Sequence, residues 1–302
     1  MLRYTPKYLK EANQALLAQD IRTARQRLEA CDLCPRQCKV NRLAGQTGIC
    51  RTGPAARVSS WGPHFGEEAP LVGTGGSGTI FFSGCNLMCS FCQNYGISHN
   101  ERGFDTTPEQ LAGIMLDLQH QGCGNINFVT PSHVVPQILE ALPLAAEQGL
   151  RIPLVYNSSG YDRVDALRLL EAAFDIFLPD FKFWDPEPAK RFCQAPDYPE
   201  TARKAIQEMF RQAGNLRTDT LGKAISGVII RHLVMPLGLA GTEQIMAFLK
   251  ELVSPGIHVN IMSQYRPMGE TGSIPDLSRP VTRREYHDAL EAAKRLNMVI
   301  MD

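Results

Sequence analysis

The chain of 302 residues carries 31 Lys and Arg side chains and 31 Asp and Glu side chains, so its formal net charge is zero. A nucleic-acid-binding protein normally shows a basic excess or a basic stripe, and this balance argues against that class. No run of about 18 apolar residues occurs, so no membrane-spanning segment is expected. The length fits one α/β barrel with a small appendage.

The cysteine content points to metal binding in a reducing compartment. Nine cysteines, an odd number, occur in the chain. The first residues, Met-Leu-Arg-Tyr-Thr-Pro-Lys, lack the apolar core of a secretory signal peptide. We therefore expect a cytoplasmic protein whose cysteines ligate metal rather than form disulfides.

The N-terminal segment contains a compact group of four cysteines. Apolar residues at helical spacing predict a helix over residues 8–30, and Cys31, Cys34, Cys38 and Cys50 follow it. Four soft ligands so close together suit a closed structural Zn²⁺ site or a second iron–sulfur cluster, and the spacing leaves both open. Free buried cysteines are the third alternative.

Residues 51–78 are rich in Pro and Gly and predict a connector with a fixed path. His64 lies in it, and a surface or packing role is favoured there over an approach to an active site. A domain boundary is expected near residue 70. It divides the chain into a helix, cysteine-rich metal-binding module and connector (1–70) and a larger α/β domain (71–302).

A second cysteine group lies further along the chain. An apolar β-rich run begins at Thr79 and breaks at Gly84 into a loop that carries Cys85, Cys89 and Cys92. Three thiolates at this spacing can hold three irons of a [4Fe-4S] cube and leave the fourth iron open to a non-protein ligand. A zinc site normally fills four positions, and no fourth ligand lies nearby in the sequence. Three unrelated buried cysteines are the other alternative.

From residue 79 onward, apolar β runs alternate with helical patterns, which predicts a parallel sheet with right-handed crossovers. Six strand–helix units are compatible with a partial (β/α)6 barrel or with an open doubly wound sheet. In both folds the active site lies at the carboxyl ends of the strands. The predicted strands are 79–84, 125–130, 152–157, 175–180, 226–234 and 257–262, and the predicted helices are 107–120, 134–148, 162–172, 198–213, 241–253 and 282–295.

Polar residues follow several of these strands. Asp180 and Lys182 end the fourth strand on one face of the extended chain, so they form an anion–cation pair suited to a zwitterionic ligand. A surface ion pair of little value is the alternative. Arg231 lies in the fifth strand, where a buried charge needs a partner or access to the barrel mouth. The other strand-end candidates are Thr130, Ser132 and His133, then Asn157 and Ser159, and finally Gln264.

The Cys-x3-Cys-x2-Cys motif at the end of a first strand resembles that of the radical S-adenosylmethionine (SAM) superfamily. The block Gly-Ser-Gly-Thr-Ile-Phe-Phe-Ser-Gly-Cys-Asn and the later strand ends resemble, more narrowly, the pyruvate formate-lyase activating enzyme-like proteins with an N-terminal cysteine cluster. The resemblance implies a partial (β/α)6 barrel and a [4Fe-4S] cluster on Cys85, Cys89 and Cys92. It also implies that SAM binds the open iron.

The resemblance implies SAM contacts at the strand ends as well. The Asp180-x-Lys182 element and the polar turn with Asn157 and Ser159 match those of the activases. The strand that carries Arg231 also matches theirs, so Arg231 is a candidate for contact with a carboxylate of SAM or of the substrate. Two family elements are replaced here. Thr130-Pro-Ser132 stands where a Gly-Gly-Glu element is common, and Gln264-Tyr-Arg266 stands where a Pro-Tyr-His-like element is common.

The activity implied by the resemblance is reductive cleavage of SAM to methionine and a 5′-deoxyadenosyl radical, which abstracts hydrogen from a substrate. An activase-like oxidoreductase would act on a glycyl radical enzyme and take electrons from a donor such as flavodoxin or ferredoxin. The alternative is radical modification of a small molecule or peptide, with the N-terminal module as an auxiliary site. A non-enzymatic iron–sulfur sensor or carrier is the third class.

Overall fold

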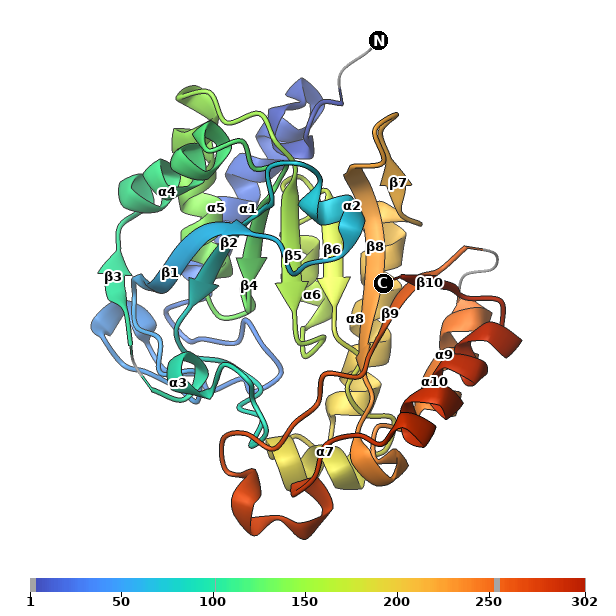
Figure 1. The fold of residues 1–302 in the computed structure, drawn as a ribbon. Coiled ribbons are helices and arrows are strands. Elements are labelled where there is room, and N and C mark those ends of the chain that lie inside the picture. Colours follow the sequence, from blue (N-terminus) through green and yellow to red (C-terminus); the bar gives the residue numbers. More distant parts are fainter. Residues whose placement is uncertain (1–3, 101, 253–255, 302) are drawn as a thin grey trace.

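The computed structural model describes residues 4–100, 102–252 and 256–301, and it contains one large, mostly parallel sheet flanked by helices (Figure 1). All six strands predicted from residue 79 onward are present, and each pairs in parallel with its predecessor among them. They are β2 (Ser77–Phe82), β4 (Ile126–Val129), β5 (Leu154–Ser158), β6 (Ile176–Pro179), β8 (Ala224–Leu233) and β9 (His258–Met262). The α/β fold class is thus confirmed.

The order of these strands decides between the two predicted architectures. A doubly wound sheet reverses its strand order near its centre, whereas here the order β2-β4-β5-β6-β8-β9 follows the chain without reversal. This is the order of a (β/α) barrel that stays open, because the sheet ends in β10 on one side and β3 on the other. The carboxyl ends of the parallel strands therefore meet at one end of the molecule.

Helices connect the strands and flank the sheet (Figure 1). Those predicted after residue 100 occur within four residues of the expected bounds, and α4 and α10 both begin with capping boxes. Within the described ranges, every helix is too short or too polar to cross a lipid bilayer. The bounds are α4 (Pro108–His120), α5 (Val135–Glu147), α6 (Val164–Arg168), α8 (Tyr198–Ala213), α9 (Thr242–Leu252) and α10 (Arg283–Arg295).

Several short elements were not predicted from the sequence. After α10 the chain adds β10 (Val299–Met301), which pairs in parallel with β9 and extends the sheet. Most of these elements have two to four residues and one has eight, which is too short for a clear periodicity in the sequence. The others are α2 (Ala69–Val72), α3 (Tyr95–Ser98), β3 (Phe104–Thr106), α7 (Pro186–Cys193), β7 (Arg217–Thr218) and the 3-10 turns Arg42–Ala44, Pro236–Gly238, Thr271–Ser273 and Pro275–Leu277.

The N-terminal helix is shorter than predicted. Two 3-10 turns, Lys7–Leu9 and Glu11–Asn13, precede α1 (Gln14–Gln26). Tyr8 is buried and its hydroxyl donates to the carbonyl of Ile152, which fixes this segment against the sheet. Lys10 is consequently extended (φ −74°, ψ 127°), and the regular helix begins only after it.

The Pro- and Gly-rich connector contains a strand that the sequence did not indicate. β1 (Ala56–His64) pairs antiparallel with β2 and joins the main sheet. Pro63 is tolerated because β3 pairs only with the start of β1 and leaves the outer edge at residue 63 without a described strand partner. The short α2 that follows places Leu71 in a buried cluster with residues of β5, β6 and β8. The connector therefore contributes a strand to the sheet and a side chain to the core that packs against it.

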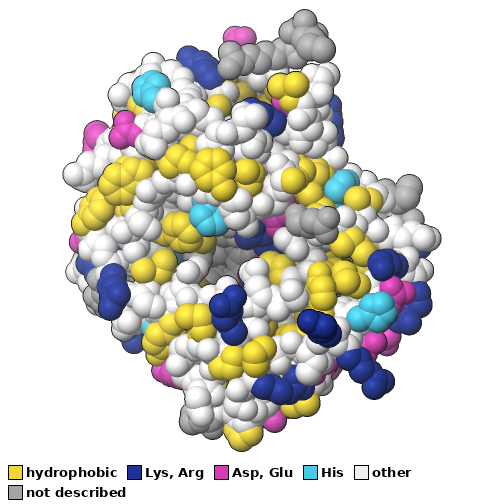
Figure 2. All heavy atoms as spheres, viewed as in Figure 1, with side chains coloured by type: hydrophobic (Ala, Val, Ile, Leu, Met, Phe, Trp, Pro, Cys, Tyr) yellow, Lys and Arg dark blue, Asp and Glu magenta, His cyan; other side chains and the backbone are white. Residues whose placement is uncertain are grey.

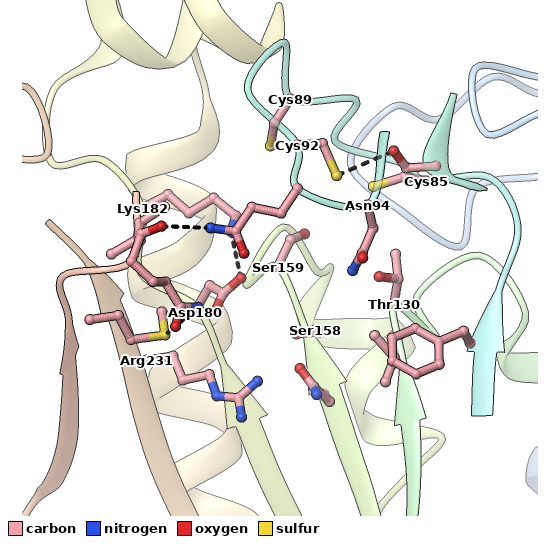
Figure 3. Close-up of a pocket in the computed structure, with 18 of the residues that line it drawn as sticks. Cys85, Cys89, Cys92, Asn94, Thr130, Ser158, Ser159, Asp180, Lys182 and Arg231 are labelled. Carbon is pink, nitrogen blue, oxygen red and sulfur yellow. Dashed lines mark hydrogen bonds and ion pairs between the residues drawn. The ribbon is translucent and has the colours of Figure 1, made fainter. Parts of the chain in front are cut away.

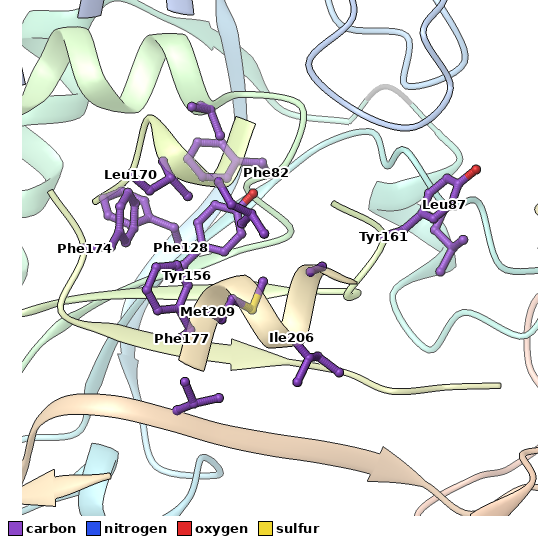
Figure 4. Packing of buried hydrophobic residues seen from close by; sticks show 14 of the residues in the cluster. Phe82, Leu87, Phe128, Tyr156, Tyr161, Leu170, Phe174, Phe177, Ile206 and Met209 are labelled. Carbon is purple, nitrogen blue, oxygen red and sulfur yellow. The ribbon is translucent and has the colours of Figure 1, made fainter. Parts of the chain in front are cut away.

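The main core lies between the sheet and the helices that cover it. Phe82 and Phe128 stack with ring centroids 6.3 Å apart, and Phe174 meets the edges of Phe128 and Tyr156 (Figure 4). Side chains that alternate along β4 and β5 point to opposite faces. Because Phe128 and Tyr156 pack outward in this way, their neighbours Val129 and Asn157 face the other side, where the pocket lies.

Candidate functional site

A pocket of about 370 Å³ opens at the carboxyl ends of the parallel strands. It forms a hollow near the middle of the face shown in Figure 2, with basic side chains visible inside. Residues from the cysteine loop, from the ends of β4, β5 and β6, and from β8 and β9 line it together (Figure 3). The predicted site residues that it brings together are Cys85, Cys89, Cys92, Thr130, Asn157, Ser159, Asp180, Lys182, Arg231 and Gln264.

The cysteine loop is held in a compact turn after β2. Gly84 has a φ of +81°, and a Cβ at this position would lie 2.3 Å from the carbonyl oxygen of Cys50, so only glycine fits here. Cys85 and Cys89 are buried and Cys92 is partly buried. The Leu87 N–H donates to Cys85 Sγ at 3.3 Å, and a hydroxyl from α3 donates to Cys92 Sγ at the same distance.

The donor set of this loop fits a [4Fe-4S] cluster. Burial raises the pKa of the Cys85 thiol to about 12, so metal binding must displace its proton. In the described part of the chain, no three His, Cys, Asp or Glu side chains are arranged to hold a single metal ion. In a [4Fe-4S] cube each cysteine binds its own iron, and three cysteines leave the fourth iron open. Cys85, Cys89 and Cys92 all line the same pocket, so their thiols could hold three irons there.

Asp180 and Lys182 form an ion pair inside the pocket. Lys182 Nζ lies 2.5 Å from Asp180 Oδ2, and the two side chains are 15% and 21% exposed. Burial acts against the charge on Lys182, but the carboxylate of Asp180 outweighs it and the pKa of Lys182 is raised. The ammonium group is therefore fully charged at neutral pH and faces the same cavity as the cysteines (Figure 3).

Arg231 is surrounded by carboxylates from the connector that sequence reasoning did not single out. Its Nε and Nη2 bind both carboxylate oxygens of Glu68 at 2.7 Å, and Nη2 also contacts Glu67. Asn260 Nδ2 donates to Glu68 at 2.9 Å. Burial would raise the pKa of Glu68, yet Arg231 more than compensates and lowers it. Two anions therefore balance the charge of Arg231.

The strand ends of β4 and β5 approach each other closely. Thr130 adopts a left-handed conformation (φ +59°), and its N–H donates to the carbonyl of Asn157 at 2.8 Å. Gly160 follows Ser159, and a Cβ on Gly160 would lie 2.3 Å from the carbonyl oxygen of Asp180. A larger residue here would push the carboxyl ends of β5 and β6 apart. Backbone and short polar groups are thus exposed to the cavity (Figure 3).

Two strand-end candidates do not line the pocket. After Thr130 the chain turns away from the cavity and buries Ser132 and His133. His133 Nε2 lies 2.9 Å from the carbonyl oxygen of Ser83, beneath the cysteine loop. Burial lowers the pKa of His133 to about 4, so it is neutral at physiological pH and structural. Ser132, which was expected to contact SAM, is therefore not among the residues that line this cavity.

Other residues at the site had no clear sequence signal. His64 and Glu67 line the pocket from the connector, and the His64 side chain, 47% exposed, also packs edge-on against Phe81. Cys193, at the end of α7, lies with its sulfur 3.4 Å from Cys89 Sγ. It comes from a position 104 residues away, and only the fold brings it there.

The four N-terminal cysteines lie apart from this cavity. Cys31, Cys34 and Cys50 are buried and Cys38 is partly buried, and none of them lines the pocket. Their segment packs against the back of the cysteine loop. Arg36 donates to the carbonyls of Asn86, Leu87, Cys193 and Gln194 and so joins the two segments.

Comparison with known proteins identifies a domain within the chain. The sequence profile of the radical SAM superfamily matches residues 79–221. An uncharacterized protein of Methanocaldococcus jannaschii is 34% identical over 293 residues, which cover 94% of this chain and 80% of that protein.

Two solved structures are also similar, at low sequence identity. The first is methylornithine synthase (PylB), at 16% identity and a TM-score of 0.46, where the match covers 74% of this chain and 63% of that one. The second is a radical SAM methyltransferase from Sphaerobacter thermophilus, at 12% identity and a TM-score of 0.48, covering 98% and 94%. The profile match spans the cysteine loop and most of the strand ends that form the pocket. Residues 79–221 therefore form a radical SAM superfamily domain.

Proposed function

We propose that Cys85, Cys89 and Cys92 hold the [4Fe-4S] cluster that the family implies, and that SAM binds between this loop and the Asp180–Lys182 pair. The observation that carries the proposal is that all five side chains line one pocket. When bound and reduced, the cluster supplies the electron that cleaves SAM to methionine and a 5′-deoxyadenosyl radical, which then takes hydrogen from a substrate.

The protein residues would bind and orient SAM. Lys182 would donate to its carboxylate, and Asp180 would accept from its ammonium group. Asn157, Ser159, Thr130 and Gln264 supply neutral polar groups around the same cavity for its remaining atoms. Arg231 lines the pocket too, but Glu67 and Glu68 already balance its charge. We therefore propose that Arg231 forms part of the pocket wall and does not bind SAM through its charge.

We propose an activase-like role, with a glycine-bearing loop of a partner enzyme as the substrate. A cavity of 370 Å³ lies near the lower end of the range of about 300–1,000 Å³ for single small-ligand sites. SAM would occupy much of it, and a narrow loop that enters from the open face fits the remainder better than a second free ligand. Flavodoxin or ferredoxin is the expected class of electron donor, and radical modification of a small molecule or peptide is the alternative.

The proposed cluster ligands are tested by exchanging one cysteine. Cys89→Ala should abolish 5′-deoxyadenosine formation under a strong chemical reductant, because a cluster loop with two cysteines cannot hold three irons. Cys123→Ala is the matched control, since Cys123 is also buried but does not line the pocket. Retained SAM cleavage in Cys89→Ala would overturn the assignment.

The substrate class is tested by isotope transfer. A peptide with a glycine deuterated at Cα should pass deuterium to 5′-deoxyadenosine if the chain acts on glycine loops. SAM cleavage that proceeds without any label transfer from such peptides, or from an intact glycyl radical enzyme, would favour the small-molecule alternative.

We further propose that the four cysteines within residues 1–70 bind metal and that residues 71–302 form the catalytic barrel, to whose sheet the connector adds β1. The four cysteines lie together behind the cysteine loop, and this supports a common ligand. Sequence spacing leaves both zinc and a second cluster open for them.

A further inference from the structure

We infer that the thiol of Cys193 donates a hydrogen bond to the cluster ligand Cys89 and thereby raises the reduction potential of the cluster at this loop. Cys193 is then a positioning residue of the reductive step and not itself a ligand. The inference rests on the proposed function only in taking Cys85, Cys89 and Cys92 as the ligands of the cluster.

Hydrogen bonds reach all three sulfurs of the cysteine loop. Cys85 receives one from a backbone N–H. The donor to Cys92 is the Ser98 hydroxyl, which also lies 2.8 Å from a histidine ring nitrogen and so has a second partner. The donor to Cys89 is the thiol of Cys193, at 3.4 Å, and within the described ranges this thiol has no other acceptor. Cys193 is therefore the side-chain donor whose hydrogen bond goes to the loop alone.

The end of α7 holds Cys193 against the cysteine loop. The Ser90 N–H donates to the Phe192 carbonyl at 2.9 Å, and each of these two residues is the sequence neighbour of one of the two cysteines. Arg36 Nη2 donates to the Cys193 carbonyl at 2.7 Å and also to the Leu87 carbonyl of the loop. These contacts tie the backbone at the end of α7 to the backbone of the loop, so the fold sets the distance between the two sulfurs.

Burial decides which of the two sulfurs is the donor. Cys89 is 7% exposed and Cys193 is 1% exposed. Two negative charges side by side in a buried site are costly. Cys89 lines the pocket and must be a thiolate to bind iron, whereas Cys193 does not line the pocket. Cys193 is therefore the donor and Cys89 the acceptor.

A donor at a ligand sulfur favours the reduced form of the cluster. Reduction adds one negative charge, part of which lies on the ligand sulfurs, and hydrogen bonds to these sulfurs are one of the factors that set the reduction potential. The bond is stronger in a buried site than in water. The Cys193 thiol would thus make the cluster easier to reduce for an electron donor of the flavodoxin or ferredoxin class.

The experiment is a redox titration followed by electron paramagnetic resonance, without SAM, on full-length proteins reconstituted anaerobically with iron and sulfide. Cys193→Ala removes the donor, whereas Cys193→Ser differs from it only by a hydroxyl that can donate. We expect Cys193→Ala to keep the wild-type iron content and to lower the ratio of reduced to oxidised cluster at a fixed potential by about 3- to 10-fold. This corresponds to a midpoint about 30–60 mV more negative. Cys193→Ser should recover most of the shift.

Further variants identify the signal and control for the loss of a buried thiol. The resonance that Cys89→Ala lacks belongs to the cluster of the cysteine loop. Cys123→Ala removes another buried thiol that does not line the pocket, and it should keep the wild-type midpoint. If Cys193→Ala holds no iron, Cys193→Val and Cys193→Thr form a second pair, since their side chains have the same shape and differ in one hydroxyl. Cys193→Thr should then have the more positive midpoint of the two.

Equal midpoints for the wild type and Cys193→Ala would overturn the inference, as would equal shifts in the alanine and serine variants, which would reveal an effect of packing. Loss of iron from every Cys193 variant would also overturn it, because Cys193 would then be a ligand or a packing residue. SAM cleavage is assayed on the same preparations. A wild type whose midpoint depends on Cys193 but which does not cleave SAM would refute the proposed SAM chemistry and leave the role of Cys193 standing.

Discussion

The charged side chains of the pocket are paired before any ligand arrives. Asp180 and Lys182 hold each other at 2.5 Å in a largely buried setting, where an unpaired charge would be costly. A zwitterionic ligand can replace this internal ion pair by two ion pairs with itself. Its carboxylate can bind the Lys182 ammonium, and its ammonium can bind the Asp180 carboxylate. No charge is left unpaired during the exchange, which suits the amino acid end of SAM.

Lys182→Met should therefore weaken SAM binding by roughly 10- to 100-fold, because it removes one charge-assisted hydrogen bond worth about 1.5–3 kcal/mol and leaves Asp180 without its cation. Iron content should stay at the wild-type value, since Lys182 is not a cluster ligand. The measurement is equilibrium binding of SAM to the reconstituted protein. Lys204→Met is the matched control, because Lys204 is exposed on α8 and pairs with Glu200. Equal affinities in the two variants would contradict the assigned role.

Residue types and spacings predicted part of this site. That the three loop cysteines lie at one pocket could be predicted because they are close together in the sequence after a strand, and the Asp180-x-Lys182 pair could be predicted because both side chains fall on one face of a strand end. Glu67 and Glu68 could not, since they lie in a connector without periodicity and meet Arg231 only through the fold. Ser132 was expected at the cavity from its place in the family element, but after the left-handed Thr130 the chain leads away from the pocket.

At the level of secondary-structure elements, apolar runs and the Gly and Pro residues within them explain which strands could be predicted from the sequence and which could not. The parallel strands were found because each is a short apolar run between helices of regular period. β1 escaped detection because Gly62 and Pro63 fall inside it, and both residues normally argue against a strand. The sequential strand order, which separates the open barrel from the doubly wound sheet, depends on long-range pairing that no local pattern encodes.

The contact between the two cysteine segments can be tested through a single glycine. Gly84→Ala combines a left-handed φ of +81° with a Cβ placed 2.3 Å from the Cys50 carbonyl oxygen, so the loop and the N-terminal module must move apart. We expect a loss of about 1–3 kcal/mol in stability and a clear loss of iron from the reconstituted protein. Thermal unfolding and iron analysis report the two effects.

Gly113→Ala serves as the control for this substitution. Gly113 lies inside α4, and a Cβ there would meet nothing within 4 Å, so alanine should be neutral or stabilise the protein by up to about 1 kcal/mol. Wild-type iron content and stability in Gly84→Ala would show that the two segments do not constrain each other.

On the scale of the whole molecule, a buried carboxylate joins the N-terminal segment to the end of the sheet opposite the pocket. Asp175, just before β6, accepts hydrogen bonds from the Tyr4 hydroxyl at 2.7 Å, the Lys7 N–H at 2.9 Å and the Leu154 N–H at 3.1 Å. It is fully buried. Burial outweighs these hydrogen bonds and raises the pKa of Asp175 to about 6. The stability of the entire domain therefore depends on the protonation of this group.

The sign of that dependence follows from linkage. The ordinary pKa of the carboxyl group is 3.8, so between this value and about 6 the folded state binds more protons than the unfolded state, and stability falls as pH rises through this window. From pH 5 to pH 7 the loss due to Asp175 should be about 1 kcal/mol. Asp175→Asn does not titrate, so the stability difference between wild type and this variant should shift by that amount in urea unfolding. Asp105→Asn, at an exposed carboxylate, should show no such shift. A pH-independent difference for Asp175→Asn would mean that the buried carboxyl titrates alike in both states, and that the N-terminal anchor is held by its hydrogen bonds alone.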